Sequence, residues 1–227
     1  VVKKKFNIDL HKAKYFAGHS LGEYSAIACA NYLDFKETIQ VLKKRGDAMQ
    51  NSVPNGEGGM LAVLGTTVEN IEKILDDNKN DFLAEIANDN SEGQIVLSGK
   101  TQDLQKLSYV FKENKIKNIK LPVSAPFHSS LMKKATEIMT KELQKLNFKK
   151  GNNVLISNIT ADEVFNANEI KDLLTKQIEN RVRWRESIIN MINKGVNEFI
   201  EIGPGKILSG LVKRINKEVV VNSINNE

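Results

Sequence analysis

The stretch 16-FAGHSLGEYSA-26 places Ser20 between two glycines at G-x-S-x-G spacing, directly after an apolar run and directly before a helix-like sequence. We expect residues 15–17 to end a buried strand and residues 21–31, which are rich in small and apolar side chains, to form a helix. Glu23 falls in the first turn of that helix, where the helix dipole favours an acidic side chain. The pattern predicts a tight strand-to-helix turn with a serine at its tip.

The serine in this turn has two interpretations. As a nucleophile, Ser20 needs a base that accepts its proton and groups that stabilise an oxyanion. Gly18 and Gly22 lack side chains, so we expect the strand and the helix to approach closely around a strained serine. The helix that begins at Leu21 would direct free N–H groups toward a developing negative charge. As an ordinary residue, the serine would simply cap the helix of a βα turn.

Three histidines are present, and one of them is the best candidate for a base. His11 lies in a polar stretch, which favours a surface position. His19 adjoins Ser20 in sequence, so its side chain should point away from the hydroxyl, and we expect a packing or hydrogen-bonding role. His128 lies in 122-PVSAPFHSSLM-132, where two prolines restrict the backbone before a helix. That stiff setting suits a positioned base, although an ordinary loop histidine would have the same surroundings.

Length and composition exclude several classes of protein. A chain of 227 residues with 41% hydrophobic content can bury a substantial core. No apolar run approaches the roughly 20 residues that span a bilayer, and the first residues lack the apolar region of a secretory signal. The single cysteine, Cys29, excludes an internal disulfide, and we expect it to be a buried thiol. These features predict a soluble protein of the cytoplasm, or of an organelle matrix, without a membrane partner.

The net charge of +5 comes from lysines that are scattered along the chain. A scattered distribution is typical of a solvated surface, but it also suits attraction of an acidic partner. The sequence has no zinc-ligand spacing, no aromatic RNA-binding motif and only 6% aromatic residues. We therefore expect no nucleic-acid partner.

The remaining sequence alternates strands and helices, which predicts an α/β fold with a parallel sheet. Residues 58–122 follow the order β-α-β-β-α-β of a ferredoxin-like unit. We therefore expect residues 1–57 and 123–227 to form a hydrolase-like α/β body, and residues 58–122 to form an inserted ferredoxin-like subdomain. Further strands are expected at residues 60–65, 83–87, 94–99, 116–123 and 154–160, and a further buried strand at residues 197–203. Residues 88–93 are expected to form the loop between two of these strands. Further helices are expected at residues 36–50, 68–78, 101–114, 130–146, 169–177, 181–195 and after the loop that begins at residue 203.

Four segments together resemble the malonyl-CoA:acyl carrier protein transacylase family. In chain order they are GHSLGEYSA (18–26), KKRGDAMQ (43–50), PVSAPFHSSLM (122–132) and EIGPGKILSGLVKR (201–214). The resemblance covers almost the whole chain, including the ferredoxin-like unit. It implies transfer of a malonyl group from coenzyme A to the phosphopantetheine thiol of an acyl carrier protein, in fatty acid biosynthesis. We expect a monomer that uses no metal and no redox cofactor.

The resemblance also implies roles for individual residues. Ser20 would accept the acyl group, and His128 would be its general base and later its acid. The main-chain carbonyl of Gln177 would orient the imidazole, and the N–H of Leu21 would donate to the oxyanion. Arg45 matches the arginine that binds the free carboxylate of the malonyl group, because a guanidinium can make two parallel hydrogen bonds to it.

Three further residues are expected near the substrate. Phe127 resembles the bulky residue of malonyl-selective members, and its ring would leave little room for a methyl branch at the malonyl α-carbon. One methyl group discriminates by only about 1–3 kcal/mol, so this selectivity should be partial. Asn90, in 88-NDNSEG-93, and Asn158, in the segment NIT, are expected to shape loops or to line the pocket.

The first residues depart from the pattern of the family. Members have a G-Q-G-S-Q loop that supplies a second oxyanion N–H, and nothing in 1-VVKKKFNIDLHKAKYFAG-18 matches it. We expect a truncated chain that is weakly active or inactive unless the missing segment is present as another chain, because one oxyanion donor contributes roughly 2.7–4 kcal/mol. Two alternatives stay open at this point. One is a serine esterase or thioesterase, which would need an acidic partner for His128, and the other is a non-catalytic fragment that binds the carrier.

Overall fold

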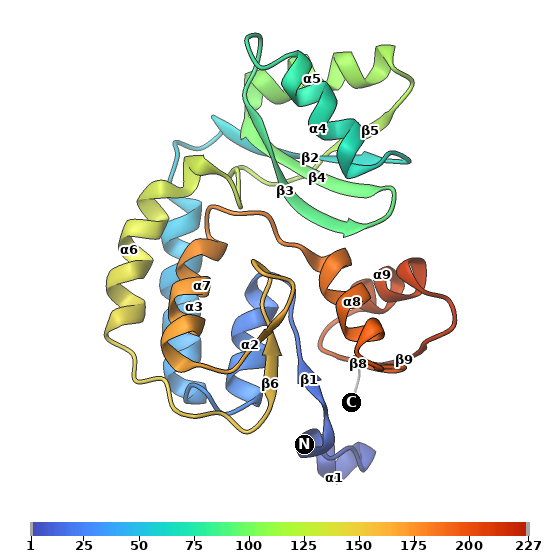
Figure 1. Cartoon of the computed structure of the whole chain (residues 1–227). Helices are drawn as coiled ribbons and strands as arrows, with labels where there is room; N and C mark the ends of the chain where they lie inside the picture. Colours follow the sequence, from blue (N-terminus) through green and yellow to red (C-terminus); the bar gives the residue numbers. More distant parts are fainter. Residues whose placement is uncertain (1, 226–227) are drawn as a thin grey trace.

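The computed structural model describes residues 2–225 and alternates helices with strands (Figure 1), which confirms the α/β fold class. Within these residues no helix combines the length and the apolarity needed to cross a membrane. The strands are β1 (Tyr15–Phe16), β2 (Gly58–Leu64), β3 (Ala84–Ser91), β4 (Gln94–Lys100), β5 (Lys117–Lys120), β6 (Val154–Ile156), β7 (Glu163–Val164), β8 (Glu198–Ile202) and β9 (Val220–Ile224). The α-helices are α1 (Val2–Phe6), α2 (Leu21–Cys29), α3 (Phe35–Gln50), α4 (Val68–Asp77), α5 (Thr101–Glu113), α6 (Lys133–Gln144), α7 (Ala167–Gln177), α8 (Trp184–Asn193) and α9 (Ile207–Ile215), and the short 3-10 helices are η1 (Leu10–Lys12) and η2 (Ser130–Met132).

The body of the protein is built around the turn that joins β1 to α2. Strand β1 pairs in parallel with β6, and β6 pairs antiparallel with β7. Helices α2, α3, α6 and α7 lie together beside this small sheet (Figure 1) and share one hydrophobic core. Tyr24 and Ile27 of α2 are fully buried in that core. The core therefore immobilises α2 and, with it, the turn that contains Ser20.

Gly18 is required by the close approach of the end of β1 to the start of α2. A Cβ atom on Gly18 would lie 2.0 Å from the carbonyl carbon of Gly22 and 2.5 Å from the nitrogen of Glu23. A Cβ atom on Gly22, in contrast, would meet nothing within 4 Å. The prediction that both glycines permit the close approach is confirmed for Gly18 and wrong for Gly22. Only the backbone of Gly22 takes part in the contact.

Residues 58–122 contain a four-stranded antiparallel sheet with the strand order β3-β4-β2-β5. Helices α4 and α5 cover the face of this sheet that is turned away from the body (Figure 1). Successive side chains of a strand point to opposite faces, so Leu61 and Val63 of β2 join the core with the helices. Met60 joins a second cluster on the opposite face, against Phe127. The boundaries of the ferredoxin-like subdomain stay a prediction.

The segment between α7 and α8 extends the edge of this sheet. Val182 forms a parallel bridge with Asn88 of β3. The N–H of Val182 donates to the carbonyl of Ala87 at 2.8 Å, and the N–H of Asp89 donates to the carbonyl of Val182 at 3.0 Å. Strand β3 is therefore held by main-chain hydrogen bonds to the segment that leads into α8.

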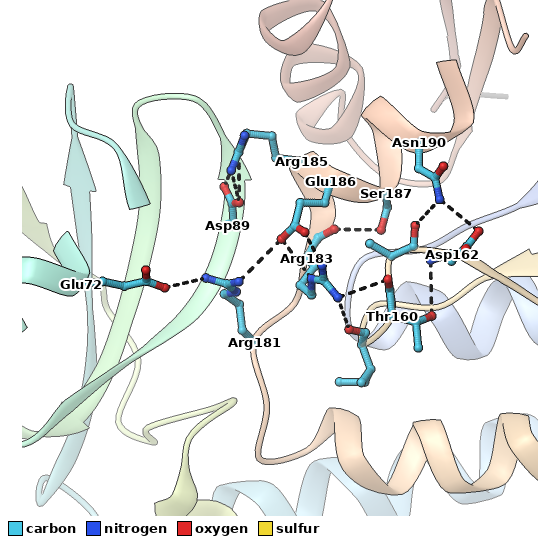
Figure 2. A network of polar contacts seen from close by, with 12 residues as sticks. Glu72, Asp89, Thr160, Asp162, Arg181, Arg183, Arg185, Glu186, Ser187 and Asn190 are labelled. Carbon is cyan, nitrogen blue, oxygen red and sulfur yellow. Dashed lines mark hydrogen bonds and ion pairs between the residues drawn. The ribbon is translucent and has the colours of Figure 1, made fainter. Parts of the chain in front are cut away.

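A network of ion pairs crosses the same junction (Figure 2). Arg185 of α8 lies 2.9 Å from the carboxylate of Asp89, whose side chain is 1% exposed, and its Nε contacts both carboxylate oxygens at 3.0 Å. Arg181 joins Glu72 of α4 at 3.3 Å to Glu186 of α8 at 3.6 Å. These contacts fix residues 58–122 relative to the rest of the protein.

The C-terminal part forms a third small sheet with its own helices. Strands β8 and β9 pair in parallel, and α8 and α9 pack on a core that includes Trp184, Ile188 and Leu211. Parallel pairing is thus present, as predicted, but β1–β6 and β8–β9 belong to two separate sheets. Strand β7 runs antiparallel because the chain reverses in the short turn that follows β6.

Three further local predictions are wrong. Asn88–Ser91, predicted as part of a loop, continues β3, because two irregularities in register let β3 follow β4 to its end. The strand predicted as buried at residues 197–203 is exposed at alternate positions, with Ile202 47% exposed. Cys29 is exposed, because it lies one helical turn after the exposed Ser25 on the outward face of α2.

Candidate active site

Ser20 lies at the tip of the turn between β1 and α2 in a strained conformation. Its φ of +52° and ψ of −104° fall in a region that residues with a side chain rarely adopt. Its side chain makes no capping hydrogen bond to α2. The interpretation of Ser20 as an ordinary capping residue is therefore wrong, and the strained turn presents the hydroxyl to other parts of the chain.

His128 lies within hydrogen-bonding distance of that hydroxyl, although it is 108 positions away in sequence. Its Nε2 is 2.7 Å from Oγ of Ser20, and its Nδ1 is 2.7 Å from the main-chain carbonyl oxygen of Gln177. A carbonyl oxygen can only accept, so Nδ1 carries the proton and Nε2 is free to accept the proton of the hydroxyl. Gln177 is the last residue of α7, where the negative end of the helix dipole favours an imidazolium.

The loop that carries His128 is fixed by the strands of the antiparallel sheet. The hydroxyl of Ser98 in β4 donates to the carbonyl of Phe127 at 2.5 Å. Gly58 in β2 leaves room for the ring of Pro126, since a Cβ atom there would lie 2.3 Å from Cδ of the proline. The side chain of Phe127 packs against the body core and against the sheet. His128 itself is 3% exposed and has a φ of +59°.

Arg45 reaches the hydroxyl of Ser20 from α3. Its Nη2 donates to Oγ of Ser20 at 2.9 Å and to Oε1 of Gln177 at 2.9 Å. The residue is 6% exposed and its guanidinium lies 5.5 Å from the centre of the Tyr24 ring. Its Nε is buried and has no acceptor among the described residues. A buried guanidinium with a spare N–H beside a serine hydroxyl is suited to bind a carboxylate.

Asn158 holds the turn from the opposite side. Its Oδ1 accepts the N–H of Ser20 at 2.7 Å, and its Nδ2 donates to the carbonyl of Gly18 at 2.8 Å. The strand predicted at residues 154–160 ends at Ile156, so Asn158 lies in the turn after β6. Its side chain is therefore free to bridge the two ends of the serine turn. Its expected part in shaping this region has a structural basis, and any contact with substrate stays a prediction.

Asn90 and His19 meet at the junction between β3 and the body. Oδ1 of Asn90 is 2.8 Å from Nε2 of His19, and the imidazole of His19 is tilted against Trp184 with the ring centres 5.7 Å apart. These contacts agree with the expected packing and hydrogen-bonding role of His19. Asn90 lies on a strand rather than in the predicted loop, and among the described hydrogen bonds it has none with Ser20. His11 is exposed in η1, as expected.

The family model of the acyl transferase domain matches residues 11–224. The chain belongs to the acyl transferase domain family. It is 43% identical over 220 residues to the malonyl CoA-acyl carrier protein transacylase of Bacillus subtilis (strain 168), covering 96% of this chain and 69% of that protein. The acyl-carrier-protein-S-malonyltransferase structure from Bartonella henselae matches with a TM-score of 0.95 and 38% identity, covering 99% of this chain and 72% of that one. A complex of a type II PKS acyl-carrier protein with its malonyl-transacylase matches with a TM-score of 0.94 and 32% identity, covering 100% and 73%.

One residue of the candidate site was not predicted from the sequence, where Glu23 was expected only to interact with the helix dipole. Glu23 is 4% exposed, and its carboxylate accepts from Nε2 of Gln177 at 2.6 Å and from the N–H of Asn158 at 3.3 Å. Helical spacing contains a signal for this position, because Glu23 lies four residues before the buried Ile27 and thus on the same face of α2.

Burial and charge shift the pKa values of two residues in the candidate site. Burial, together with the nearby charge of Arg45, lowers the pKa of His128 to about 3. Burial raises the pKa of Glu23 to about 7, although hydrogen bonds from Gln177 and Asn158 and the charge of Arg45 lower it. At neutral pH His128 is therefore in the neutral form that accepts a proton.

Proposed function

We propose that this acyl transferase moves a malonyl group from coenzyme A to the phosphopantetheine thiol of an acyl carrier protein, as a step of fatty acid biosynthesis. The observation that carries the proposal is the convergence of two groups on Oγ of Ser20, with His128 at 2.7 Å and Arg45 at 2.9 Å. The first supplies a base and the second a fixed cation. The names of the matched relatives, which are malonyl transferases, support the same reaction.

In the first half-reaction Oγ of Ser20 attacks the thioester carbonyl while Nε2 of His128 takes the hydroxyl proton. The carbonyl of Gln177 accepts from Nδ1 throughout, so it stabilises the imidazolium. Leu21 is the first residue of α2, and its N–H donates to the oxyanion. The carbon–sulfur bond then breaks, the thiolate of coenzyme A takes the proton from His128, and malonyl remains as a seryl ester.

The second half-reaction reverses these steps with the carrier as acceptor. The phosphopantetheine thiol gives its proton to Nε2 of His128, and its sulfur attacks the ester carbonyl. The carbon–oxygen bond breaks, and Oγ of Ser20 takes the proton back. Because coenzyme A leaves before the carrier thiol reacts, the kinetics are ping-pong. Every step is a proton transfer or an acyl transfer, so the proposed chemistry requires no metal or redox cofactor.

Arg45 selects and orients the acyl group in this proposal. Two parallel hydrogen bonds to the malonyl carboxylate hold the three-carbon chain in one direction, with the ester directed toward the incoming thiol rather than toward water. Phe127, next to His128 and partly buried, limits the space for a branch at the α-carbon.

A serine esterase or thioesterase is the main alternative, and two observations argue against it. Such an enzyme would need a carboxylate on His128, but Nδ1 contacts the carbonyl of Gln177. It would also need a neutral acyl pocket, but Arg45 places a buried charge beside Ser20. A non-catalytic carrier-binding fragment would need neither the strained serine nor its base.

Intact-protein mass spectrometry tests the proposal. The protein is incubated with malonyl-CoA and weighed, and phosphopantetheinylated acyl carrier protein is then added. We expect the mass of one malonyl group on the protein, followed by its appearance on the carrier. The Ser20→Ala variant serves as the control and should remain unlabelled. Absence of the label would contradict the nucleophile, and loss of the label to water before the carrier is added would favour the esterase.

A further inference from the structure

Glu23 lies buried beside the reactive groups, and the proposed reaction does not use its carboxyl. Its Oε2 accepts from Nε2 of Gln177 at 2.6 Å, and its Oε1 accepts from the N–H of Asn158 at 3.3 Å. The charge of Arg45 on α3 lowers the pKa of this carboxyl, and so does the hydroxyl of Ser157 in the turn after β6. Burying a carboxylate costs free energy unless the carboxylate is paired or hydrogen-bonded. The partners of Glu23 therefore indicate its role.

The carboxamide of Gln177 joins Glu23 to Arg45. Its Nε2 donates to Glu23 at 2.6 Å and to the carbonyl of Ser20 at 3.0 Å, while its Oε1 accepts from Nη2 of Arg45 at 2.9 Å. Ionised Glu23 can only accept and a guanidinium can only donate, so a single orientation of the amide satisfies both neighbours. Glu23 thereby determines which end of the carboxamide faces Arg45.

The orientation of the carboxamide matters because Arg45 has few other anchors. Its described hydrogen bonds go to Oγ of Ser20 and to Oε1 of Gln177, so Gln177 is the partner that does not take part in the reaction through its side chain. If the amide turned over, its NH₂ group would face the guanidinium, and donor would meet donor. The guanidinium would then lose the acceptor that holds it next to Ser20.

We propose that Glu23 is a positioning residue for substrate selection: its carboxylate orients the carboxamide of Gln177, and the carboxamide holds the guanidinium of Arg45 where the substrate carboxylate binds. This inference rests on the proposed function, because the malonyl carboxylate is the group that Arg45 takes. His128 depends on the main-chain carbonyl of Gln177 rather than on its amide, so the base is less affected than the specificity.

The Glu23→Gln variant tests the proposal, because it keeps the shape of the side chain but leaves one acceptor oxygen for two donors, Nε2 of Gln177 and the N–H of Asn158. We expect kcat/KM for malonyl-CoA to fall roughly 10- to 100-fold, the effect of losing one charge-assisted hydrogen bond, while kcat/KM for acetyl-CoA changes less than about threefold. A purely structural role would lower both values together. Glu113→Gln is the matched control, since Glu113 is exposed at the end of α5 and has no described side-chain hydrogen bond.

A double-mutant cycle locates the effect in the carboxamide. Gln177→Met removes the amide and keeps the main-chain carbonyl that contacts His128. If Glu23 acts through the amide, adding Glu23→Gln to Gln177→Met should change malonyl transfer by less than about threefold. The proposal would be overturned if the two substitutions lowered malonyl transfer independently, so that their fold-losses multiplied in the double variant.

Nuclear magnetic resonance decides the inference separately from the proposed function. In protein labelled with ¹⁵N in glutamine and arginine, Glu23→Gln should shift the side-chain amide signals of Gln177 and the Nε–H signal of Arg45. Unchanged signals would refute the positioning role even if malonyl transfer is normal. A wild-type protein that fails to transfer malonyl would refute the proposed function, and these shifts would still decide the role of Glu23.

Discussion

Replacing Arg45 by methionine separates malonyl recognition from the acyl-transfer chemistry. Methionine keeps much of the side-chain volume over the Tyr24 ring and removes the guanidinium. In the proposed complex the guanidinium makes two charge-assisted hydrogen bonds to the malonyl carboxylate, each contributing about 1.5–3 kcal/mol. Binding the carboxylate disturbs the existing 2.9 Å contacts to Ser20 and Gln177, which offsets part of that gain. A net loss of about 3–4 kcal/mol corresponds to a fall of roughly 10²- to 10³-fold in kcat/KM.

The assay compares malonyl-CoA with acetyl-CoA as donors to the same acyl carrier protein. Acetyl has no carboxylate, so its kcat/KM should be unchanged or higher in Arg45→Met. Removal of the arginine also raises the pKa of His128, because the charge of Arg45 lowers that pKa in the wild type. His128 must be neutral to act as a base, so the acid limb of the pH profile for acetyl transfer should move to higher pH. Circular dichroism before and after substitution controls for misfolding.

Equal losses for malonyl-CoA and acetyl-CoA would refute this reasoning. Such a result would mean that Arg45 supports the serine turn in general, through its contact with Oγ of Ser20, rather than the substrate carboxylate. Arg45→Lys provides a graded comparison. It keeps the charge and loses the planar fork, so we expect malonyl transfer between those of Arg45→Met and the wild type.

Four further predictions address stability, the substrate and the partner. Arg185→Ala should lower the free energy of unfolding by about 3 kcal/mol in urea titration, because it leaves the buried Asp89 without its cation. Glu72→Gln, at an exposed ion pair, should lower it by under about 1 kcal/mol. Similar losses in the two variants would contradict a larger contribution from the buried pair. Burial raises the pKa of Glu23 from 4.5 to about 7, so its contribution to folding is complete below pH 4.5 and is lost as the pH rises to 7. The unfolding free energy of wild type minus that of Glu23→Gln should therefore fall by about 3 kcal/mol across this interval, and a flat difference would show that the carboxyl titrates normally. Phe127→Ala should raise methylmalonyl transfer relative to malonyl transfer by up to roughly 100-fold. An unchanged ratio would show that the ring does not determine this selectivity. Higher ionic strength should raise KM for an acidic carrier more than KM for malonyl-CoA, because the net charge of +5 attracts the carrier over a distance; equal responses would exclude electrostatic docking.

Local spacing accounts for the parts of the fold that sequence analysis predicted well. The strand, turn and helix of residues 16–26 follow from an apolar run, a glycine-flanked serine and a run of small residues. All of these features involve residues that are close together in the sequence. The requirement for glycine at Gly18 also follows from the tightness of such a turn. The alternation of strands and helices further on is enough to predict an α/β protein, because periodicity depends on near neighbours.

Errors arose where distant parts of the chain determine the environment. Asn88–Ser91 has the composition of a loop, but pairing with β4 on one side and with Val182 on the other makes it a strand. The helix containing Cys29 was predicted correctly, but the direction in which the thiol points depends on how α2 packs against the core. Propensity is a weak guide at such positions, since tertiary contacts override it.

Neighbouring residues were enough to predict a serine in a tight turn at the start of a helix, and the resemblance to known transacylases indicated which distant residues to place beside it. Tertiary packing brings His128 and Arg45 to the hydroxyl of Ser20, the end of α7 to the imidazole of His128, and the carboxyl of Glu23 to the carboxamide of Gln177. The physical reason is distance along the chain. A turn is specified by residues next to one another, whereas the position of a side chain contributed from 108 residues away depends on the packing of every element between them.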